Sequence, residues 1–432
     1  MSADTPTDRL EAALAAIDDP SGDGKKACLT VWREEARRDA QASTARLAAG
    51  TPLSPLDGRI VSIKDLFDIK GEITRAGSKA REEEPPAAAD AEAVNRLRRA
   101  GAVLIARTNM TELAFSGIGL NPHFGTPGNA HDRSRVPGGS TSGGAISVAA
   151  GMAEIALGSD TGGSTRIPPA FNGLCGMKPT QARISRAGVH PLSWSLDTVG
   201  TIARNVADLA ATDSVLSGEA ESGAAILEAG ALRLCRLDAV LGECDTEVVE
   251  AFEAALGRIR AAGAGITSRP DSWLIEDVRR MNASGGIAAV EAHAANAGLM
   301  RDHRGALDPN VSARIAKGAE IPAPDFAAAL QTLARLRLES GGIFEACDAV
   351  VLPTVPMTAP RIADLADPRA FQNANMRALS LTLLANALDL PAISLPMAST
   401  GLPTGLMLFG RRGDDRRLLK MAAALEPLAA AR

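Results

Sequence analysis

The sequence predicts an α/β fold. Short apolar runs of β character alternate with amphipathic helical segments, and this alternation is typical of a sheet covered by helices. The chain has 432 residues, 46% of them hydrophobic and 22% charged, whereas disordered chains have fewer apolar residues and a larger charge imbalance. A chain of this length can bury a sizeable core. No Pro- or Ser-rich linker divides it, so we expect one domain over residues 1–432.

The expected strands are short apolar runs, and they lie at 60–63, 102–106, 155–157, 349–352, 392–395 and 406–409. A helical stretch at 91–99 separates the first two of them. Other helices are indicated where apolar residues recur every three or four positions. This spacing runs over 249–259, after the candidate N-cap Asp245, and over 418–425, before Pro427 weakens the pattern.

Two segments differ in composition from the rest of the chain. Residues 117–144 are rich in Gly, Pro, Ser and Asn, which predicts a long structured loop. Residues 218–345 are rich in Ala, Glu and Arg and are mostly helical by pattern. We expect this second segment to be a variable helical region, inserted into the sheet domain or covering it.

Charge and residue counts exclude several classes of protein. The net charge of −5 argues against a nucleic-acid partner, since such proteins usually carry a basic stripe. No apolar run reaches the ~18 residues of a membrane span, and no signal-peptide pattern opens the chain, so we expect a cytoplasmic protein. The five cysteines are scattered, and the five histidines lack the HExxH spacing. We therefore expect free thiols, no metal site and no cofactor.

Two clusters of glycine and serine, at 138–144 and 160–166, carry the clearest chemical signal. Thr161-Gly-Gly-Ser164 can turn several N–H groups toward one point, which forms an anion-binding nest. In an acyl-transfer enzyme such a nest is an oxyanion hole beside a nucleophilic serine. Ordinary glycine-rich turns remain the alternative. The GxxxxGK[ST], GxGxxG and GxSxG motifs are absent from these clusters, which argues against a phosphate loop and an α/β-hydrolase elbow.

A nucleophilic serine needs a base, and two kinds of residue are available. A Ser-His-Asp triad would use one of the five scattered histidines. A lysine can also serve if burial lowers its pKa. Lys64 ends the apolar run Ile60-Val-Ser-Ile. From spacing alone, a solvated cap at the end of a strand is the favoured interpretation of Lys64.

The pattern of motifs resembles the amidase signature family. The family core reads GGSSGG, then GTDTGGSIRIP, then GLKPT, and this chain reads GGSTSGG, LGSDTGGSTRIP and GMKPT. The two family serines stand 24 positions apart, as Ser140 and Ser164 do. Further similar segments lie at 58–65, 106–112, 185–197 and 386–410, so the resemblance spans most of the chain. It implies the amidase-signature fold, a large mixed β-sheet core surrounded by helices.

The resemblance also assigns roles to residues. It implies that Ser164 is the acylating nucleophile, Lys64 the general base and Ser140 the relay between them, held by a cis peptide. The oxyanion hole is expected from the N–H groups of a glycine loop: Thr161, Gly162 and Gly163. For substrate contacts, Arg166 is a candidate to meet a carboxylate, and Met110 and Trp194 are candidates to line an acyl pocket. A structural role is the alternative for each of these three.

The chain departs from the family pattern near the site but not at the triad. Thr141-Ser142 replaces Ser-Gly, Ala182 and Asp389 each stand where the family has glycine, and Ile60 replaces a common proline. These changes affect the expected substrate pocket and leave the chemistry intact.

The implied activity is hydrolysis of a small carboxylic amide or ureido compound to a carboxylate and ammonia or an amine. We expect a stand-alone homodimer that needs only its small-molecule substrate. The alternative is the A subunit of a glutamine-dependent tRNA amidotransferase, which has the same triad.

Overall fold

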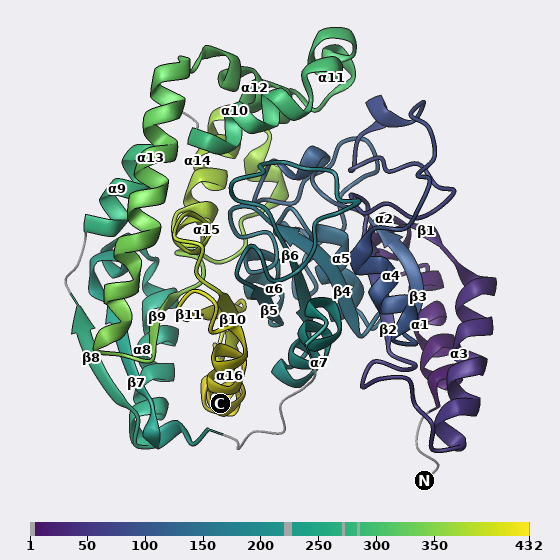
Figure 1. The fold of residues 1–432 in the computed structure, drawn as a ribbon, viewed down its shortest axis with the longest axis horizontal. Helices are drawn as coiled ribbons and strands as arrows, with labels where there is room; N and C mark the ends of the chain where they lie inside the picture. The colour runs from purple at the N-terminus through teal and green to yellow at the C-terminus, as the bar shows by residue number, and fades with distance from the viewer. Residues whose placement is uncertain (1–4, 220–226, 270–272, 283–285, 432) are drawn as a thin grey trace.

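The computed structural model describes residues 5–219, 227–269, 273–282 and 286–431. One sheet of 11 strands runs through the molecule in the order β1-β3-β2-β4-β6-β5-β10-β11-β9-β7-β8 (Figure 1). The strands are β1 (Cys28–Val31), β2 (Ile60–Lys64), β3 (Val103–Thr108), β4 (Ile155–Asp160), β5 (Cys175–Lys178), β6 (Thr198–Ala203), β7 (Arg233–Leu237), β8 (Gly265–Arg269), β9 (Ala349–Pro353), β10 (Ala392–Met397) and β11 (Thr404–Phe409).

The sheet is mixed, as predicted. β2 runs parallel to both β3 and β4, and β7 runs parallel to both β8 and β9. The strands between these two groups, from β4 through β6, β5, β10 and β11 to β9, pair antiparallel. The edge strand β1 also pairs antiparallel, with β3. Two parallel groups are thus joined by an antiparallel centre.

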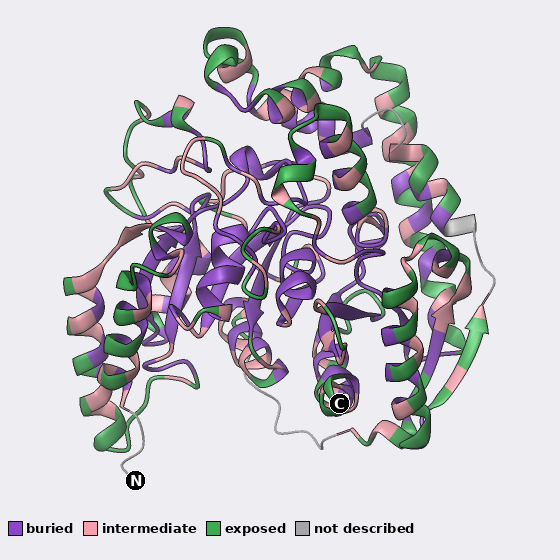
Figure 2. Cartoon of the chain, turned by 180° about the vertical axis from the view of Figure 1, so that it is seen from behind, coloured by how far each residue is buried: buried purple, intermediate pink, exposed green. Residues whose placement is uncertain are grey.

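Helices surround this sheet, and their outer faces are exposed while the centre of the molecule is buried (Figure 2). They are α1 (Pro6–Asp18), α2 (Gly24–Ala27), α3 (Arg33–Ala48), α4 (Glu92–Arg99), α5 (Ser142–Ala149), α6 (Ile167–Asn172), α7 (Val206–Ser217), α8 (Thr246–Ala261), α9 (Trp273–Asn282), α10 (Gly286–Ala295), α11 (Ala297–Asp302), α12 (Pro309–Lys317), α13 (Ala323–Glu339), α14 (Pro368–Leu379), α15 (Leu383–Ala387) and α16 (Asp415–Ala430). Within the described ranges, no helix combines the length and the apolar character that crossing a bilayer requires.

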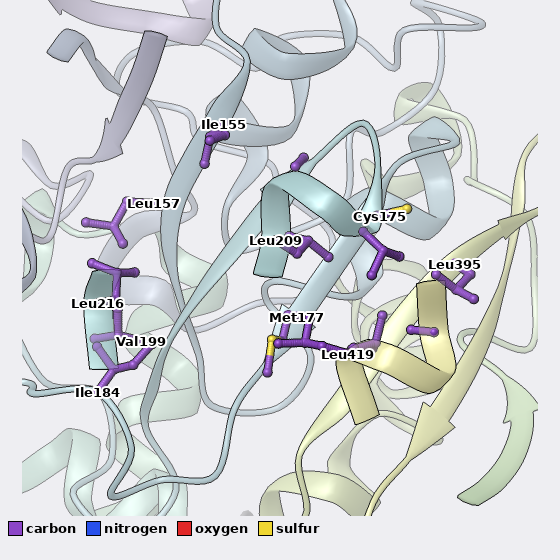
Figure 3. Close-up of a cluster of buried hydrophobic side chains, with 14 of the residues drawn as sticks. Ile155, Leu157, Cys175, Met177, Ile184, Val199, Leu209, Leu216, Leu395 and Leu419 are labelled. Carbon is purple, nitrogen blue, oxygen red and sulfur yellow. The ribbon is translucent and has the colours of Figure 1, made fainter. Parts of the chain in front are cut away.

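Strands β2 and β3 are buried on both faces, which explains their continuous apolar runs. Ile60 and Ile105 pack among apolar residues of α1 and α3. Val61 and Leu104, which point the other way, belong to the larger core. Figure 3 shows part of that core, where side chains of α7 and α16 meet strands β4, β5, β6 and β10: Ile155, Leu157, Cys175, Met177, Val199, Leu209, Leu216, Leu395 and Leu419.

The six predicted strands correspond to β2, β3, β4, β9, β10 and β11, and the predicted helices to α4, α8 and α16. Asp245 is the N-cap residue of α8, although its side chain makes no capping hydrogen bond. Pro427 lies inside α16, which continues to Ala430. The segment 117–144 is irregular over most of its length, with α5 beginning at its end.

Most of the described residues of 218–345 are helical, and the segment also contains two strands. Six helices, α8 to α13, lie in this segment, but it also supplies β7 and β8 to one edge of the sheet. Residues 220–226, 270–272 and 283–285 of the segment lie outside the described residues. β8 reads Gly-Ile-Thr-Ser-Arg and is largely exposed. An edge strand of this kind has no apolar run, so the hydrophobic pattern does not reveal it.

Candidate active site

Lys64 and Ser159 lie side by side because their strands are parallel neighbours. β2 and β4 pair in register, with Ile63 opposite Leu157. The carboxyl ends of the two strands therefore reach the same edge of the sheet, where sites of α/β proteins usually form. Lys64 is the last residue of β2, and Nζ of Lys64 lies 3.0 Å from Oγ of Ser159. Lys64, the predicted base, thus lies at the carboxyl end of an inner strand and is not a solvated cap.

The amine of Lys64 is fully buried and has two hydroxyl partners. Its Nζ lies 2.8 Å from Oγ of Ser140, in addition to the contact with Ser159. Burial lowers the pKa of Lys64 to about 7, although the charges of Asp160 and Asp197 oppose this effect. A substantial fraction of the side chain is therefore the neutral amine near neutral pH, which is the form a general base needs.

Ser140 reaches Lys64 from a glycine-rich loop that precedes α5. The Gly139–Ser140 peptide is cis, as the resemblance implies. Gly139 has to be small, since a Cβ there would lie 2.7 Å from the carbonyl oxygen of Ser116 and 2.6 Å from the Gly119 nitrogen. Ser142 begins α5, and its buried hydroxyl has no partner within the described part of the chain. Of these two neighbouring serines, it is Ser140 that contacts Lys64.

Ser164 lies on the loop between β4 and α6, and this loop is held by Asp160. The carboxylate of Asp160 accepts hydrogen bonds from the Gly163 and Thr165 N–H groups, at 2.8 and 3.0 Å. It also pairs with the guanidinium of Arg166 at 2.9 Å. Burial opposes ionisation, but the charge and hydrogen bonds of Arg166 outweigh it and hold the pKa of Asp160 well below its usual range. Asp160 is therefore a permanent anion that fixes the loop, a role the sequence analysis did not assign.

Within this loop, the three expected oxyanion donors are not equivalent. The N–H of Gly163 donates to Asp160, so that group is engaged. Gly163 has a φ of 138°, and the carbonyl of the preceding Gly162 accepts a 2.5 Å hydrogen bond from Thr382 Oγ1. In the described part of the chain, the N–H groups of Thr161, Gly162 and Ser164 donate to no acceptor. These three form the available set of donors around Ser164.

A cavity of about 160 Å³ opens beside Ser164. The catalytic loop forms one wall with Thr161, Gly162 and Ser164, and α14 and α15 form another. Helices α10 and α12, at the top of Figure 1, supply Ala288, Ala289, Arg314 and Lys317. No hydrogen bond joins Ser164 to Ser140 in the described structure, and catalytic contacts of this kind are often long without substrate. Residues of the variable region and of α14 and α15 therefore line the same cavity as Ser164.

The three predicted substrate contacts do not line this cavity. Met110 is fully buried in the larger core. Arg166 is also fully buried, and besides Asp160 it binds the Asn386 side chain at 2.7 Å and the Thr382 carbonyl at 2.9 Å. Trp194 is half exposed, and its carbonyl accepts a hydrogen bond from Gln181. The contacts of these residues hold the fold together around the loop.

Besides Ser159 and Asp160, the sequence analysis missed Asp197. Its carboxylate accepts a hydrogen bond from the Thr161 hydroxyl at 2.5 Å and from two backbone N–H groups of the 192–193 turn. Burial raises the pKa of Asp197 to about 6, against these hydrogen bonds. A signal existed in the sequence, because Asp197 ends the Ser193-Trp-Ser-Leu segment that resembles the family. Among the described residues, no group of three or more His, Cys, Asp or Glu side chains could hold a metal ion.

Comparison with known proteins now identifies the family. A family model described as Amidase matches residues 10–419. The chain belongs to the amidase family. The 2-amino-5-chloromuconic acid deaminase of Comamonas testosteroni is 34% identical over 405 residues, which cover 91% of this chain and 86% of the deaminase. An amidase crystal structure superimposes with a TM-score of 0.88 at 33% identity, covering 99% of this chain and 96% of that one.

Relatives of a second kind are similar as well. The A subunit of the glutamyl-tRNA(Gln) amidotransferase of Anaeromyxobacter sp. (strain K) is 34% identical over 461 residues, covering 96% of this chain and 92% of the subunit. The predicted amidase-signature fold is confirmed by the structural match, and so is the predicted activity class, the hydrolysis of amide C–N bonds.

Proposed function

We propose that this amidase hydrolyses a small carboxylic amide or ureido compound through an acyl-enzyme on Ser164. One observation carries the proposal. The buried amine of Lys64 lies 2.8 Å from the hydroxyl of Ser140, while Ser164 sits on the adjoining glycine loop at the wall of the cavity. This arrangement supplies a neutral base, a hydroxyl relay and an accessible nucleophile, as acyl transfer requires.

In the acylation step, the Oγ of Ser164 attacks the amide carbon and loses its proton through Ser140 to Lys64. The carbonyl oxygen becomes an oxyanion, and the free N–H groups of Thr161, Gly162 and Ser164 are its donors. The C–N bond then breaks, and the proton from Lys64 leaves with the amine or ammonia. Water attacks the ester in the second step, and its proton follows the same route. The sum is one amide and one water giving a carboxylic acid and an amine.

The relay needs Ser140 and Ser164 to approach each other. Ser159 also contacts the amine of Lys64, at 3.0 Å, and thereby limits where the amine can point. Both serines around Lys64 are buried, which excludes bulk water from the proton path.

The proposed enzyme is a single amidase domain over residues 1–432 that acts alone as a cytoplasmic homodimer. The described cysteines are all free thiols, in keeping with a reducing compartment. The second candidate is the amidotransferase A subunit, which the similarity to such subunits favours. The isolated chain distinguishes the two candidates, since a stand-alone amidase needs no partner subunit to release ammonia.

The test is a covalent label combined with a turnover assay on the purified chain. A sulfonyl fluoride probe should modify Ser164, located by peptide mass spectrometry, and should abolish ammonia release from small amides. The Ser164→Ala variant should lose both the label and the turnover. Labelling at Ser140 or Ser142 instead, or activity in Ser164→Ala above about a hundredth of the normal rate, would contradict the assignment. Ammonia release that appears only on adding partner subunits would favour the second candidate.

A further inference from the structure

The cavity beside Ser164 carries positive charge and no negative charge among its described lining residues. Arg314 and Lys317 line it from α12, three positions apart and therefore on one face of the helix. No Asp or Glu belongs to the described lining. The remaining lining is apolar or neutral, with side chains such as Phe115, Leu192 and Leu379. A pocket of this kind attracts anions, because apolar walls strengthen the field of a charge.

Within the described part of the chain, Arg314 lacks the ion pair that the fully buried arginines have. Arg107 and Arg166 are fully buried, and each forms an ion pair with a buried aspartate, Asp65 or Asp160. Arg314 is half-buried and forms no ion pair with any described residue. Burial lowers the pKa of Arg314 to about 10, and no nearby carboxylate counters this effect. The guanidinium is still charged at neutral pH, and the described chain leaves it without a counterion.

The position of Arg314 is nevertheless well defined. Its guanidinium lies 4.1 Å from the centre of the Phe115 ring, a cation–π contact. One of its terminal nitrogens donates a hydrogen bond to the carbonyl of Phe115. A guanidinium has five N–H donors in a planar fork that matches a carboxylate. The stacking on Phe115 therefore fixes the plane of the fork, and most of its donors stay available.

A neutral donor complements the cation from α14. The side-chain oxygen of Asn375 accepts hydrogen bonds from the Ser116 hydroxyl at 2.9 Å and the Gly117 N–H at 2.8 Å. Because both groups are donors, the atom of the Asn375 side chain that faces them is its oxygen. The NH2 group of Asn375 is left as a donor, with no acceptor in the described part of the chain, and Asn375 lines the cavity. Arg314, Lys317 and the NH2 group of Asn375 thus each bring donors to the pocket, which suit a substrate with acceptor oxygens.

We propose that the cavity selects amides whose acyl part carries a carboxylate at its far end, bound by Arg314. This inference rests on the proposed function and narrows its substrate class to monoamides of short dicarboxylic acids. The amide end meets Ser164 and the free N–H groups of its loop, and the distal carboxylate meets the guanidinium. Hydrolysis converts the monoamide and water into the dicarboxylate and ammonium: the C–N bond breaks, a C–O bond to the water oxygen forms at the same carbon, and the distal carboxylate is unchanged.

The size of the cavity limits the length of the substrate. Its volume of about 160 Å³ is close to the ~150 Å³ of an engineered apolar cavity that holds benzene. A four- to six-carbon diacid monoamide is of this order of size. Glutamine is a poorer match, because its ammonium group would enter a pocket that contains two cations and no acidic residue among its described lining. The inference therefore also separates this chain from a glutamine-dependent subunit.

The experiment compares glutaramate with pentanamide, which has a methyl group where glutaramate has its carboxylate, and with glutamine. We expect kcat/KM for glutaramate to exceed that for either other amide by about 100-fold, within the range of a hydrogen-bonded charge pair. Arg314→Gln should lower kcat/KM for glutaramate about 100-fold and that for pentanamide less than about threefold. Arg314→Lys should restore part of the loss. The matched control is Arg260→Gln, at an exposed position, and it should leave kcat/KM for glutaramate and for pentanamide unchanged.

Two readouts separate this inference from the proposed function. Labelling of Ser164 by the sulfonyl fluoride, together with thermal unfolding, reports whether Arg314→Gln is folded and keeps its nucleophile. If labelling persists but both amides are affected equally, or if pentanamide is the better substrate, the carboxylate assignment is wrong and the amidase assignment stands. If Ser164 is not labelled in the unchanged chain, the proposed function itself fails.

Calorimetric binding of glutarate tests the pocket without any catalysis. We expect glutarate to bind the unchanged chain and the Ser164→Ala variant, and to bind Arg314→Gln at least tenfold more weakly. No binding to the unchanged chain, or equal binding to Arg314→Gln, would overturn the proposal. Pentanoic acid, which offers one carboxylate, serves as the reference ligand, and we expect it to bind more weakly than glutarate.

Discussion

The Thr161 hydroxyl donates a 2.5 Å hydrogen bond to Oδ1 of Asp197, and this bond ties the start of the nucleophile loop to the 192–197 turn. The other carboxylate oxygen of Asp197 accepts from the N–H groups of Leu192 and Ser193. Leu192 lines the same cavity as Ser164. One buried carboxylate thus positions two walls of the site. Its negative charge also raises the pKa of Lys64, which opposes the effect of burial.

Replacing Asp197 with Asn should therefore change both the rate and its pH dependence. The loop donors would shift, and a shift of about 1 Å can lower kcat by about 100-fold. Loss of the negative charge removes one effect that raises the pKa of Lys64, so the acidic limb of the pH–rate profile should move to lower pH. Thr161→Val keeps the carboxyl group and removes one hydrogen bond that favours its ionised form, so it should lower kcat and move the limb in the same direction by less. An Asp197→Asn profile shifted toward higher pH would contradict this reasoning.

The pH dependence of the unchanged enzyme follows from Lys64. The base must be neutral, and burial lowers the pKa of Lys64 to about 7. We expect kcat/KM to fall about tenfold per pH unit well below pH 7 and to level off above about pH 8. The measurement is a profile between pH 5 and 10 on one amide. Lys64→Arg should be inactive throughout, since its guanidinium stays charged, and substantial activity in that variant would mean that another group is the base.

The lowered pKa of Lys64 also makes the free energy of unfolding depend on pH. The folded pKa of Lys64, about 7, lies below the value of about 10.4 that an unfolded chain has. Between these values the unfolded state binds more protons, so this residue makes stability rise with pH from about 7 to about 10. Lys64→Met removes the titration. We expect Lys64→Met to be the more stable chain at pH 7, with a difference that narrows by pH 9.5, as urea unfolding at the two pH values would measure.

The serines near Lys64 should differ in importance although they are close in sequence. Ser140→Ala removes the relay, and proton transfer contributes about 10²- to 10⁴-fold to such reactions. Ser142→Ala should keep activity within about threefold, because its buried hydroxyl bonds nothing described and its loss costs little. The loss of activity in Ser159→Ala should be intermediate, since this change removes one of the two hydroxyl contacts of the Lys64 amine. The check is kcat for each variant with its thermal unfolding curve, and equal losses at Ser140 and Ser142 would refute the order.

Arg166 should prove structural when it is removed. Arg166→Met leaves the carboxylate of Asp160 buried without its cation, which costs about 3–5 kcal/mol of unfolding free energy. The double variant Asp160→Asn with Arg166→Met leaves no buried charge unpaired at this site and should recover part of the lost unfolding free energy. Arg301→Gln removes an exposed pair and should change stability by less than about 1 kcal/mol. Chemical unfolding of the four chains tests this, and a double variant no more stable than Arg166→Met would argue against the pair.

The α/β class, the glycine–serine motifs and the family could all be predicted from local patterns in the amino-acid sequence. The apolar runs of β2, β3 and β4 are readable because these strands are buried on both faces, so their hydrophobic pattern is dictated by packing. The spacing of Ser140 and Ser164 and the end position of Lys64 are local properties of the chain. They could be read without knowing which strands are neighbours, because each motif encodes its own turn or strand end.

Which residues contact those motifs depends on how the strands and helices pack in three dimensions. β5 and β6, and the edge strand β8, carry no decisive periodicity, because short central strands and exposed edges lack a long apolar pattern. The partnership of Lys64 with Ser159 depends on β2 lying parallel to β4 in register. Arg314 reaches the cavity because α12 packs over the loop that carries Phe115, about 200 positions earlier in the chain. Such contacts arise from long-range packing, and no local spacing in a single sequence encodes them.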